Sequence, residues 1–185
     1  MIFFFPFFVW HPIYNVSCFI RIDLFAHFFG FFLIPSAQTI SAKDAGFFIT
    51  KLGIGPGDTV LEAGLGSGGL SLHLARVLGE SGHLVTVESR NEHANVGLLN
   101  LQRASECFAE FPKHTHLEGM VEEVDLDHEF DAVILDMPVH PPAISACSAK
   151  IVFGGRIACY APTTSQLESC WKSCEDSGLV VEWAG

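Results

Sequence analysis

A carboxylate followed at once by a glycine-rich turn is the feature of this sequence best suited to chemistry. Residues 62–69 read EAGLGSGG and join a short apolar strand pattern to a helical pattern. Glycines in such a turn let the backbone bend sharply and approach a ligand at the N-terminus of the next helix. Glu62 would repel a pyrophosphate placed on that turn, because both groups are negative. The turn therefore favours a phosphate-free ligand that carries cationic groups.

Glu88 lies twenty residues after Gly68, at the end of the next strand pattern. An acid in this position can accept hydrogen bonds from both hydroxyls of a ribose, in NAD and in S-adenosylmethionine alike. S-adenosylmethionine combines such a ribose with ammonium and sulfonium groups, so Glu62 and Glu88 together favour it as the cofactor. The alternative is that both are ordinary solvated acids at strand ends.

A third acid, Asp136, ends the buried strand pattern FDAVILD at residues 130–136. Ligands of open α/β sheets bind at the carboxyl ends of the strands, so we expect Asp136 and Glu62 to face one crevice. A carboxylate there would lie beside the methyl group of such a cofactor and could stabilise the positive charge that develops on a neutral nitrogen as it is methylated. The alternative is a strand-end or helix-capping role. Strand alternation turns Asp131 to the opposite face, where we expect it to be structural.

Strand and helix patterns alternate from residue 36 onward, which predicts a mostly parallel, twisted α/β sheet flanked by helices. Ser41 and Asp44 form a capping box for the first helix. The expected helices are 43–52, 69–78, 91–110 and 165–177, and the expected strands are 59–63, 83–88, 114–117, 130–136, 156–160 and 179–183. The pair Gly154-Gly155 is interpreted as a turn before the fifth of these strands.

Residues 1–35 differ in composition from the rest of the chain. Eleven of the 17 Phe lie within residues 1–34. Prolines and polar residues interrupt both apolar runs before they reach the roughly 20 residues that a membrane span needs, so we expect none. We predict two parts, a Phe-rich segment at 1–35 that is unrelated to the fold and one α/β domain at 36–185.

The charge and the cysteines restrict the partners. Ten Lys and Arg against 21 Asp and Glu give a net charge of −11, and the basic residues form no cluster. Phosphate contacts supply most of the affinity of nucleic-acid binders, so an RNA substrate would have to be bound largely by a further domain or another subunit. The six cysteines are scattered without paired CxxC spacing, which predicts reduced intracellular thiols and no metal site.

Four segments resemble the tRNA adenine-N1 methyltransferases that act at tRNA position 58. They are QTISAKD at 38–44, the turn at 61–68, LDMP at 135–138, and YAPT with the following Gln at 160–166. The resemblance implies a Rossmann-like class I methyltransferase fold and a catalytic subunit that methylates N1 of adenine-58 with S-adenosylmethionine. It also implies tRNA as substrate, together with a non-catalytic partner subunit or further copies of the chain, and it leaves nucleus and mitochondrion open. Its implied cofactor-binding residues are Gln38, Glu62, Gly64, Gly66, Ser67, Gly68 and Glu88, and its implied catalytic acid is Asp136.

The sequence departs from the family at several points. Met120 stands where the family has an Asp beside the cofactor's adenine, and His140 is the one residue able to stack where the family has an aromatic residue near the target base. The family's N-terminal β-domain is not recognisable. Its seventh, antiparallel strand would follow Gly185, so we expect the domain to be incomplete at its C-terminus. Two alternatives stay open: a catalytically silent binding or assembly subunit, and another class I methyltransferase such as a protein isoaspartyl O-methyltransferase.

Overall fold

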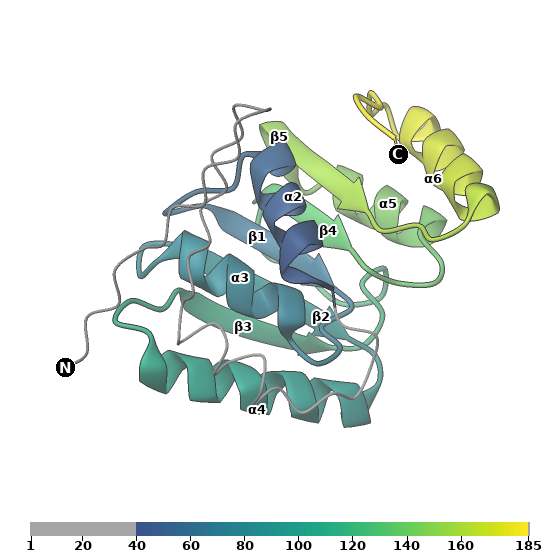
Figure 1. The fold of residues 1–185 in the computed structure, drawn as a ribbon. Coiled ribbons are helices and arrows are strands. Elements are labelled where there is room, and N and C mark those ends of the chain that lie inside the picture. Colours follow the sequence, from purple (N-terminus) through teal and green to yellow (C-terminus); the bar gives the residue numbers. More distant parts are fainter. Residues whose placement is uncertain (1–39, 185) are drawn as a thin grey trace, which may run out of the picture. The chain divides into compact units, whose positions relative to one another are not determined.

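The computed structural model describes residues 40–184 of the chain. Strands and helices alternate along this part of the chain (Figure 1). The helices are α2 (Ala42–Leu52), α3 (Gly69–Leu78), α4 (Asn91–Cys107), α5 (Pro141–Ser148) and α6 (Thr164–Asp176). The strands are β1 (Thr59–Ala63), β2 (His83–Glu88), β3 (Lys113–Glu118), β4 (Phe130–Leu135) and β5 (Ile151–Cys159).

The strands form one parallel sheet in the order β3-β2-β1-β4-β5. Along the chain, β2 and β3 are added in turn on one side of β1, and β4 then pairs with its other side. The direction of building therefore reverses between β1 and β4. In open parallel sheets, ligands bind at the carboxyl ends of the strands at such a reversal. Glu62 is at the end of β1, and Asp136 directly follows β4.

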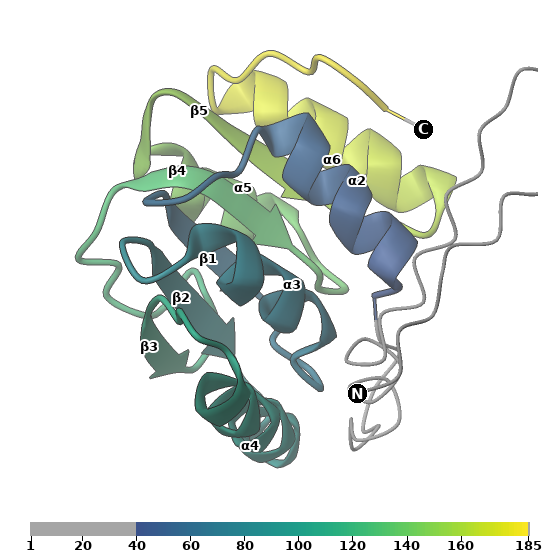
Figure 2. The ribbon, with the colours of Figure 1, turned by 60° about the vertical axis from the view of Figure 1, so that its left-hand side comes forward.

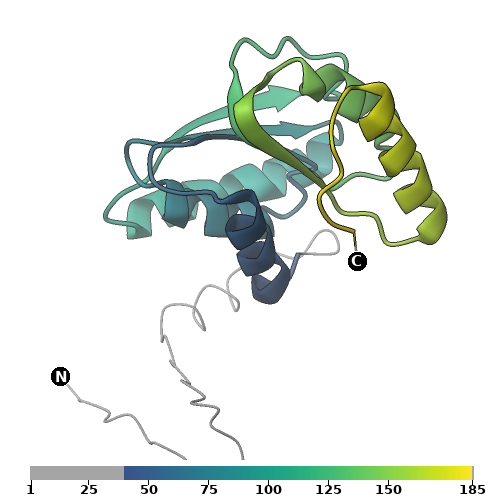
Figure 3. The same cartoon turned by 90° about the horizontal axis from the view of Figure 1, so that it is seen from above.

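Helices cover both faces of the sheet. One face carries α2, α3 and α4, and the other carries α5 and α6 (Figures 2 and 3). This double cover explains why every residue of β2 and nearly all of β1 are buried, since central strands of parallel sheets are enclosed on both faces. Apolar layers on the two faces enclose β1 and β4, which pair in parallel and so end at the same edge of the sheet.

Most of the expected elements are confirmed. The strands at 59–63 and 83–88 and the helix at 69–78 have the predicted bounds. The capping box is also confirmed, because the hydroxyl of Ser41 accepts a hydrogen bond from the backbone N–H of Asp44 and donates one to its carboxylate.

Three expectations were wrong in detail, and one helix was missed. The glycine pair is not a turn before the fifth strand, because β5 begins at Ile151 and takes up residues 154–155 as an irregularity in its pairing with β4. Helix α5 was not predicted, although Pro141 at its start is a typical first helical residue. Helix α4 ends at Cys107, three residues early, where Phe108 turns into extended backbone. Residues 179–183 contain no strand, because their backbone pairs with no strand in the described part of the chain.

Candidate active site

The glycine turn packs directly against the end of β4. Gly64 has a φ of 99°, and a Cβ atom there would lie 2.0 Å from the carbonyl oxygen of Asp136. The backbone N–H of Asp136 donates to the carbonyl of Ala63 at 2.8 Å, and the N–H of Gly64 donates to the carbonyl of Val87 at 2.9 Å. These contacts hold the turn at the junction of three strand ends. Only a residue without a side chain allows this approach.

Helix α4 supports the turn from the other side. The side-chain amide of Asn100, which is buried, donates a hydrogen bond to the carbonyl of Ser67 at 2.9 Å. Gly97, one helical turn earlier, lets the helix approach closely, since a Cβ atom there would lie 2.6 Å from a side-chain carbon of Leu65. The turn is thus held by a contact between segments some thirty residues apart in sequence.

Glu62 is a buried carboxyl group at the base of the turn. Only 1% of it is exposed, and the hydroxyl of Ser71 donates a 2.5 Å hydrogen bond to it. Burial raises the pKa of Glu62 to about 8, the Ser71 hydrogen bond acts in the opposite direction, and the charge of Asp136 adds to the rise. Within residues 40–184 no Lys, Arg or His forms an ion pair with Glu62. A cationic ligand would supply the counter-charge that this carboxyl group lacks.

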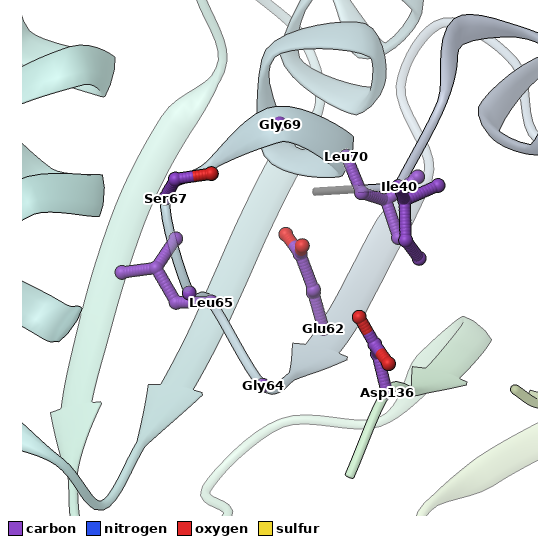
Figure 4. A pocket seen from close by; sticks show the side chains of 9 residues that line it. Ile40, Glu62, Gly64, Leu65, Ser67, Gly69, Leu70 and Asp136 are labelled. Atoms are coloured by element: carbon purple, nitrogen blue, oxygen red, sulfur yellow. The ribbon is translucent and has the colours of Figure 1, made fainter. Parts of the chain in front are cut away.

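Asp136 faces the same space as Glu62. The two carboxyl groups come from neighbouring strand ends and point into one hollow beneath the start of α3 (Figure 4). Burial raises the pKa of Asp136 to about 6, while the cation of Arg90 lowers it and the charge of Glu88 raises it further. Asp136 is therefore still mostly ionised at neutral pH. By contrast, Asp131 accepts a hydrogen bond from the backbone of Thr59 at 2.8 Å, which confirms its predicted structural role.

Glu88 is held by four donors. Its Oε1 accepts from the backbone N–H of Arg90 at 3.0 Å and from Nε of the same residue at 3.1 Å. Its Oε2 accepts from the backbone N–H of Gly66 at 3.1 Å and from Nη2 of Arg90 at 3.3 Å. Burial acts to raise the pKa of Glu88, but the hydrogen bonds from Arg90 and Gly66 outweigh it and hold the pKa below its usual value.

The structure brings most of the predicted site residues together. The hollow is lined by residues from the segment before α2, the end of β1, the turn, α3 and the end of β4 (Figure 4). These residues are Ile40, Glu62, Gly64, Leu65, Gly66, Ser67, Gly69, Leu70 and Asp136. Gly68 is the N-cap of α3, and Glu88 reaches the turn through Gly66. Gln38 lies outside the described residues.

Met120 and His140, the two residues that depart from the family pattern, lie in different surroundings in the structure. Met120 is 42% exposed in the segment after β3. His140 is the N-cap residue of α5 and is 1% exposed, so the expectation that it could stack on a base is wrong for the described conformation. The loop after Asp136 is instead tied to α6, where the side chain of Gln166 donates to the carbonyl of Pro138 at 3.1 Å. This bond gives the YAPT…Q segment a role in positioning that loop.

Several contributing residues could not be singled out from the sequence. Ser71, Arg90 and Asn100 all bond to site residues, yet each is of a type common on helix surfaces and in loops. For Arg90, the signal was its position two residues after Glu88, because an arginine side chain can donate two hydrogen bonds to one carboxylate. For Asn100, it was a glycine three residues earlier inside a helix, which suggests that the helix packs closely against another segment.

Other kinds of site were not found in the described part of the chain. No helix among residues 40–184 is both long and apolar enough to cross a membrane. The same residues contain no cluster of three His, Cys, Asp or Glu that could hold a metal ion. The five described cysteines are free thiols.

The sheet order, the glycine turn and the acids at the strand ends define a class I methyltransferase. A solved SAM-dependent O-methyltransferase from Thermotoga maritima superposes with a TM-score of 0.69 at 29% identity, covering 77% of this chain and 52% of its own. Residues 28–181 match the family described as tRNA methyltransferase complex GCD14 subunit, and the chain belongs to this family.

Curated relatives carry a specific reaction in their names. The chain is 30% identical over 169 residues to tRNA (adenine(57)-N(1)/adenine(58)-N(1))-methyltransferase TrmI of Methanocaldococcus jannaschii, covering 78% of this chain and 59% of the relative. It is 32% identical over 148 residues to tRNA (adenine(58)-N(1))-methyltransferase TrmI of Thermus thermophilus, covering 80% of this chain and 56% of the relative. The chain thus spans somewhat more than half the length of these relatives.

Proposed function

We propose that the chain is the catalytic subunit of a tRNA adenine-N1 methyltransferase, which transfers a methyl group from S-adenosylmethionine to N1 of adenine-58. Membership of the GCD14 family and the names of the two relatives support this reaction. The observation that carries the proposal is the pair of carboxyl groups, Glu62 and Asp136, at the reversal point of the sheet. Glu62 suits a cationic cofactor, and Asp136 suits a base that becomes cationic during the reaction.

The residues around the turn fit S-adenosylmethionine better than a dinucleotide. Two buried acids, Glu62 and Glu88, flank the turn, and among the described residues no basic side chain lines the hollow. A pyrophosphate on the turn would find no basic partner there and would oppose ionisation of Glu62, whereas a cationic ligand favours its ionised form. Glu62 would hold the cationic amino-acid part, the glycines would allow close backbone approach, and Glu88 would hold the ribose.

Asp136 would act on the target base. S-adenosylmethionine supplies an electrophilic methyl group when bound. N1 of adenine attacks with a free lone pair, so the protein need not remove a proton first. The ring gains positive charge as the new bond forms, and an ionised Asp136 would stabilise this charge and accept a hydrogen bond from the exocyclic amine.

The charge of the chain bears on its partners. A net charge of −11 without a basic cluster opposes tRNA phosphates. We infer that a basic non-catalytic subunit, or a further domain, supplies most of the tRNA affinity. The family description, which names a complex, supports this inference.

Glu62→Gln is expected to weaken binding of S-adenosylmethionine about tenfold and to leave NAD binding no tighter, because the variant loses a charge-assisted contact to the cationic ligand. The wild-type carboxyl group has a pKa of about 8, so at pH 7 it must lose its proton to pair with the ligand. Calorimetric titration in two buffers of different ionisation enthalpy should therefore show release of close to one proton per ligand, and the Gln variant should show almost none.

The exposed Glu80, in the turn after α3, offers a matched control. Glu80→Gln makes the same substitution away from the hollow and should change neither affinity nor proton release. Tighter binding of NAD than of S-adenosylmethionine by the wild-type protein would contradict the assigned cofactor. Unchanged proton release in Glu62→Gln would show that another group titrates on binding.

A further inference from the structure

The carboxylate of Glu88 has no free acceptor position in the structure. A carboxylate offers about four lone-pair positions. Two are taken by the backbone N–H groups of Gly66 and Arg90, and two by Nε and Nη2 of the Arg90 side chain. The backbone donors are fixed by the turn and the strand end, whereas the guanidinium is at the end of a flexible side chain.

Burial leads to the same conclusion. The side chain of Glu88 is 3% exposed, while that of Arg90 is 59% exposed, so the guanidinium covers the carboxylate from the solvent side. Arg90 also lowers the pKa of Asp136, which places its cation within electrostatic range of the second site acid. A ribose that approaches Glu88 has to meet this guanidinium first.

We propose that the Arg90 side chain competes with the ribose of the cofactor for Glu88, and so regulates how tightly the cofactor binds. The inference rests on the proposed function, because it takes Glu88 as the ribose acceptor. The two ribose hydroxyls need two acceptor positions, and those of the guanidinium are the ones that can be released without moving the backbone of the turn or of the strand end. Cofactor binding therefore requires the Arg90 side chain to leave Glu88, while both backbone N–H groups keep the carboxylate in place.

This competition predicts the direction in which ligand affinity changes when Arg90 is removed. When only a fraction of the protein is in the binding-competent conformation, its apparent affinity for the ligand is its intrinsic affinity multiplied by that fraction. Arg90→Ala removes the competitor, so it should tighten binding of S-adenosylhomocysteine by roughly two- to sixfold, for an ion pair in the range that exposed pairs are worth. A residue that merely oriented Glu88 for the ligand would give the opposite sign, since its loss would weaken binding.

The experiment is calorimetric titration of the full chain with S-adenosylhomocysteine, for wild type, Arg90→Ala, Arg90→Lys and Arg103→Ala. Arg103 is an exposed arginine on α4, so Arg103→Ala makes the same charge change away from Glu88 and should bind like wild type. Lysine cannot bond both carboxylate oxygens in a fork, so Arg90→Lys should fall between wild type and Arg90→Ala. An analogue that lacks the 2′- and 3′-hydroxyls should show no gain with Arg90→Ala.

Thermal unfolding provides a readout that separates competition from a loss of folding. Arg90→Ala should melt at a lower temperature than wild type without ligand, and should gain more from saturating ligand than wild type does. Equal or weaker ligand binding by a folded Arg90→Ala protein would overturn the competition while leaving the proposed function intact. Failure of the wild-type protein to bind S-adenosylhomocysteine would overturn both.

Discussion

Asp136→Ala is expected to lower kcat for tRNA methylation by roughly 10²–10³, because it removes a charge that acts mainly as the adenine ring becomes cationic. Affinity for S-adenosylmethionine should stay within a few-fold of wild type, since Glu62 and Glu88 hold the cofactor in this account. The measurement is single-turnover methyl transfer to a tRNA transcript, with the partner subunit present, alongside a calorimetric titration of the cofactor.

The pH dependence of methyl transfer is a second test of the role of Asp136. Asp136 has a pKa of about 6, raised mainly by burial. With S-adenosylmethionine saturating, so that Glu62 is already ionised, wild-type kcat/KM for tRNA should fall as the pH drops below about 6 and Asp136 takes up a proton. Asp136→Asn should lose this acidic limb as well as most of its rate. Asp176, exposed at the end of α6, provides a control, since Asp176→Ala should keep the wild-type rate and profile. Near-normal turnover by Asp136→Ala would show that the acid is structural.

Gly64→Ala is expected to cause the largest loss of stability among single substitutions at the turn. The added Cβ would lie 2.0 Å from the carbonyl oxygen of Asp136, and the backbone φ of 99° is strained for any residue with a side chain. Backbone strain and overpacking each cost about 1–3 kcal/mol, so we expect the free energy of unfolding to fall by roughly 2–6 kcal/mol. Whatever protein stays folded should bind S-adenosylmethionine much more weakly, because the turn must move away from β4. Urea denaturation and cofactor titration measure the two effects.

Gly46→Ala is the matched control for this substitution. Gly46 lies within α2, and a Cβ atom there would meet nothing within 4 Å. Alanine favours helix over glycine by about 1 kcal/mol, so Gly46→Ala should be as stable as wild type or more so. A Gly64→Ala protein with wild-type stability and affinity would contradict the close packing of the turn on β4.

The parts of the fold that were predictable from the sequence are those set by local pattern. The strand at 59–63, the turn and the helix at 69–78 follow one another without a gap, and each has its own periodicity or glycine signal. That Asp136 and Glu62 meet follows from a general rule of parallel sheets, which needs no knowledge of side-chain packing. The resemblance to the methyltransferase family then assigned roles to these residues, and those roles remain proposals.

The parts that were missed depend on contacts between distant segments. Asn100 supports Ser67 across 33 residues, and nothing in the local sequence of α4 indicates this partner. The irregularity in β5 depends on its pairing with β4, so the glycine pair there was interpreted as an ordinary turn. His140 was expected to be available for stacking because of its place in the loop, whereas it is buried at the start of α5. The Phe-rich segment, Gln38 and the division of the chain at residue 35 lie outside the described structure and stay predictions.

The central claim is that this chain methylates N1 of adenine-58, and a methyl-transfer assay on an unmodified tRNA transcript tests it most directly. The chain should be incubated with labelled S-adenosylmethionine, with and without the family's non-catalytic subunit, and the modified position read by nucleoside analysis and primer extension. We predict N1-methyladenosine at position 58 when the partner is present, little product from the chain alone, and none on a transcript with guanosine at that position. Cofactor binding without any methyl transfer in the presence of the partner would contradict the claim and support a silent subunit. Transfer to a different base, or to protein, would also contradict it.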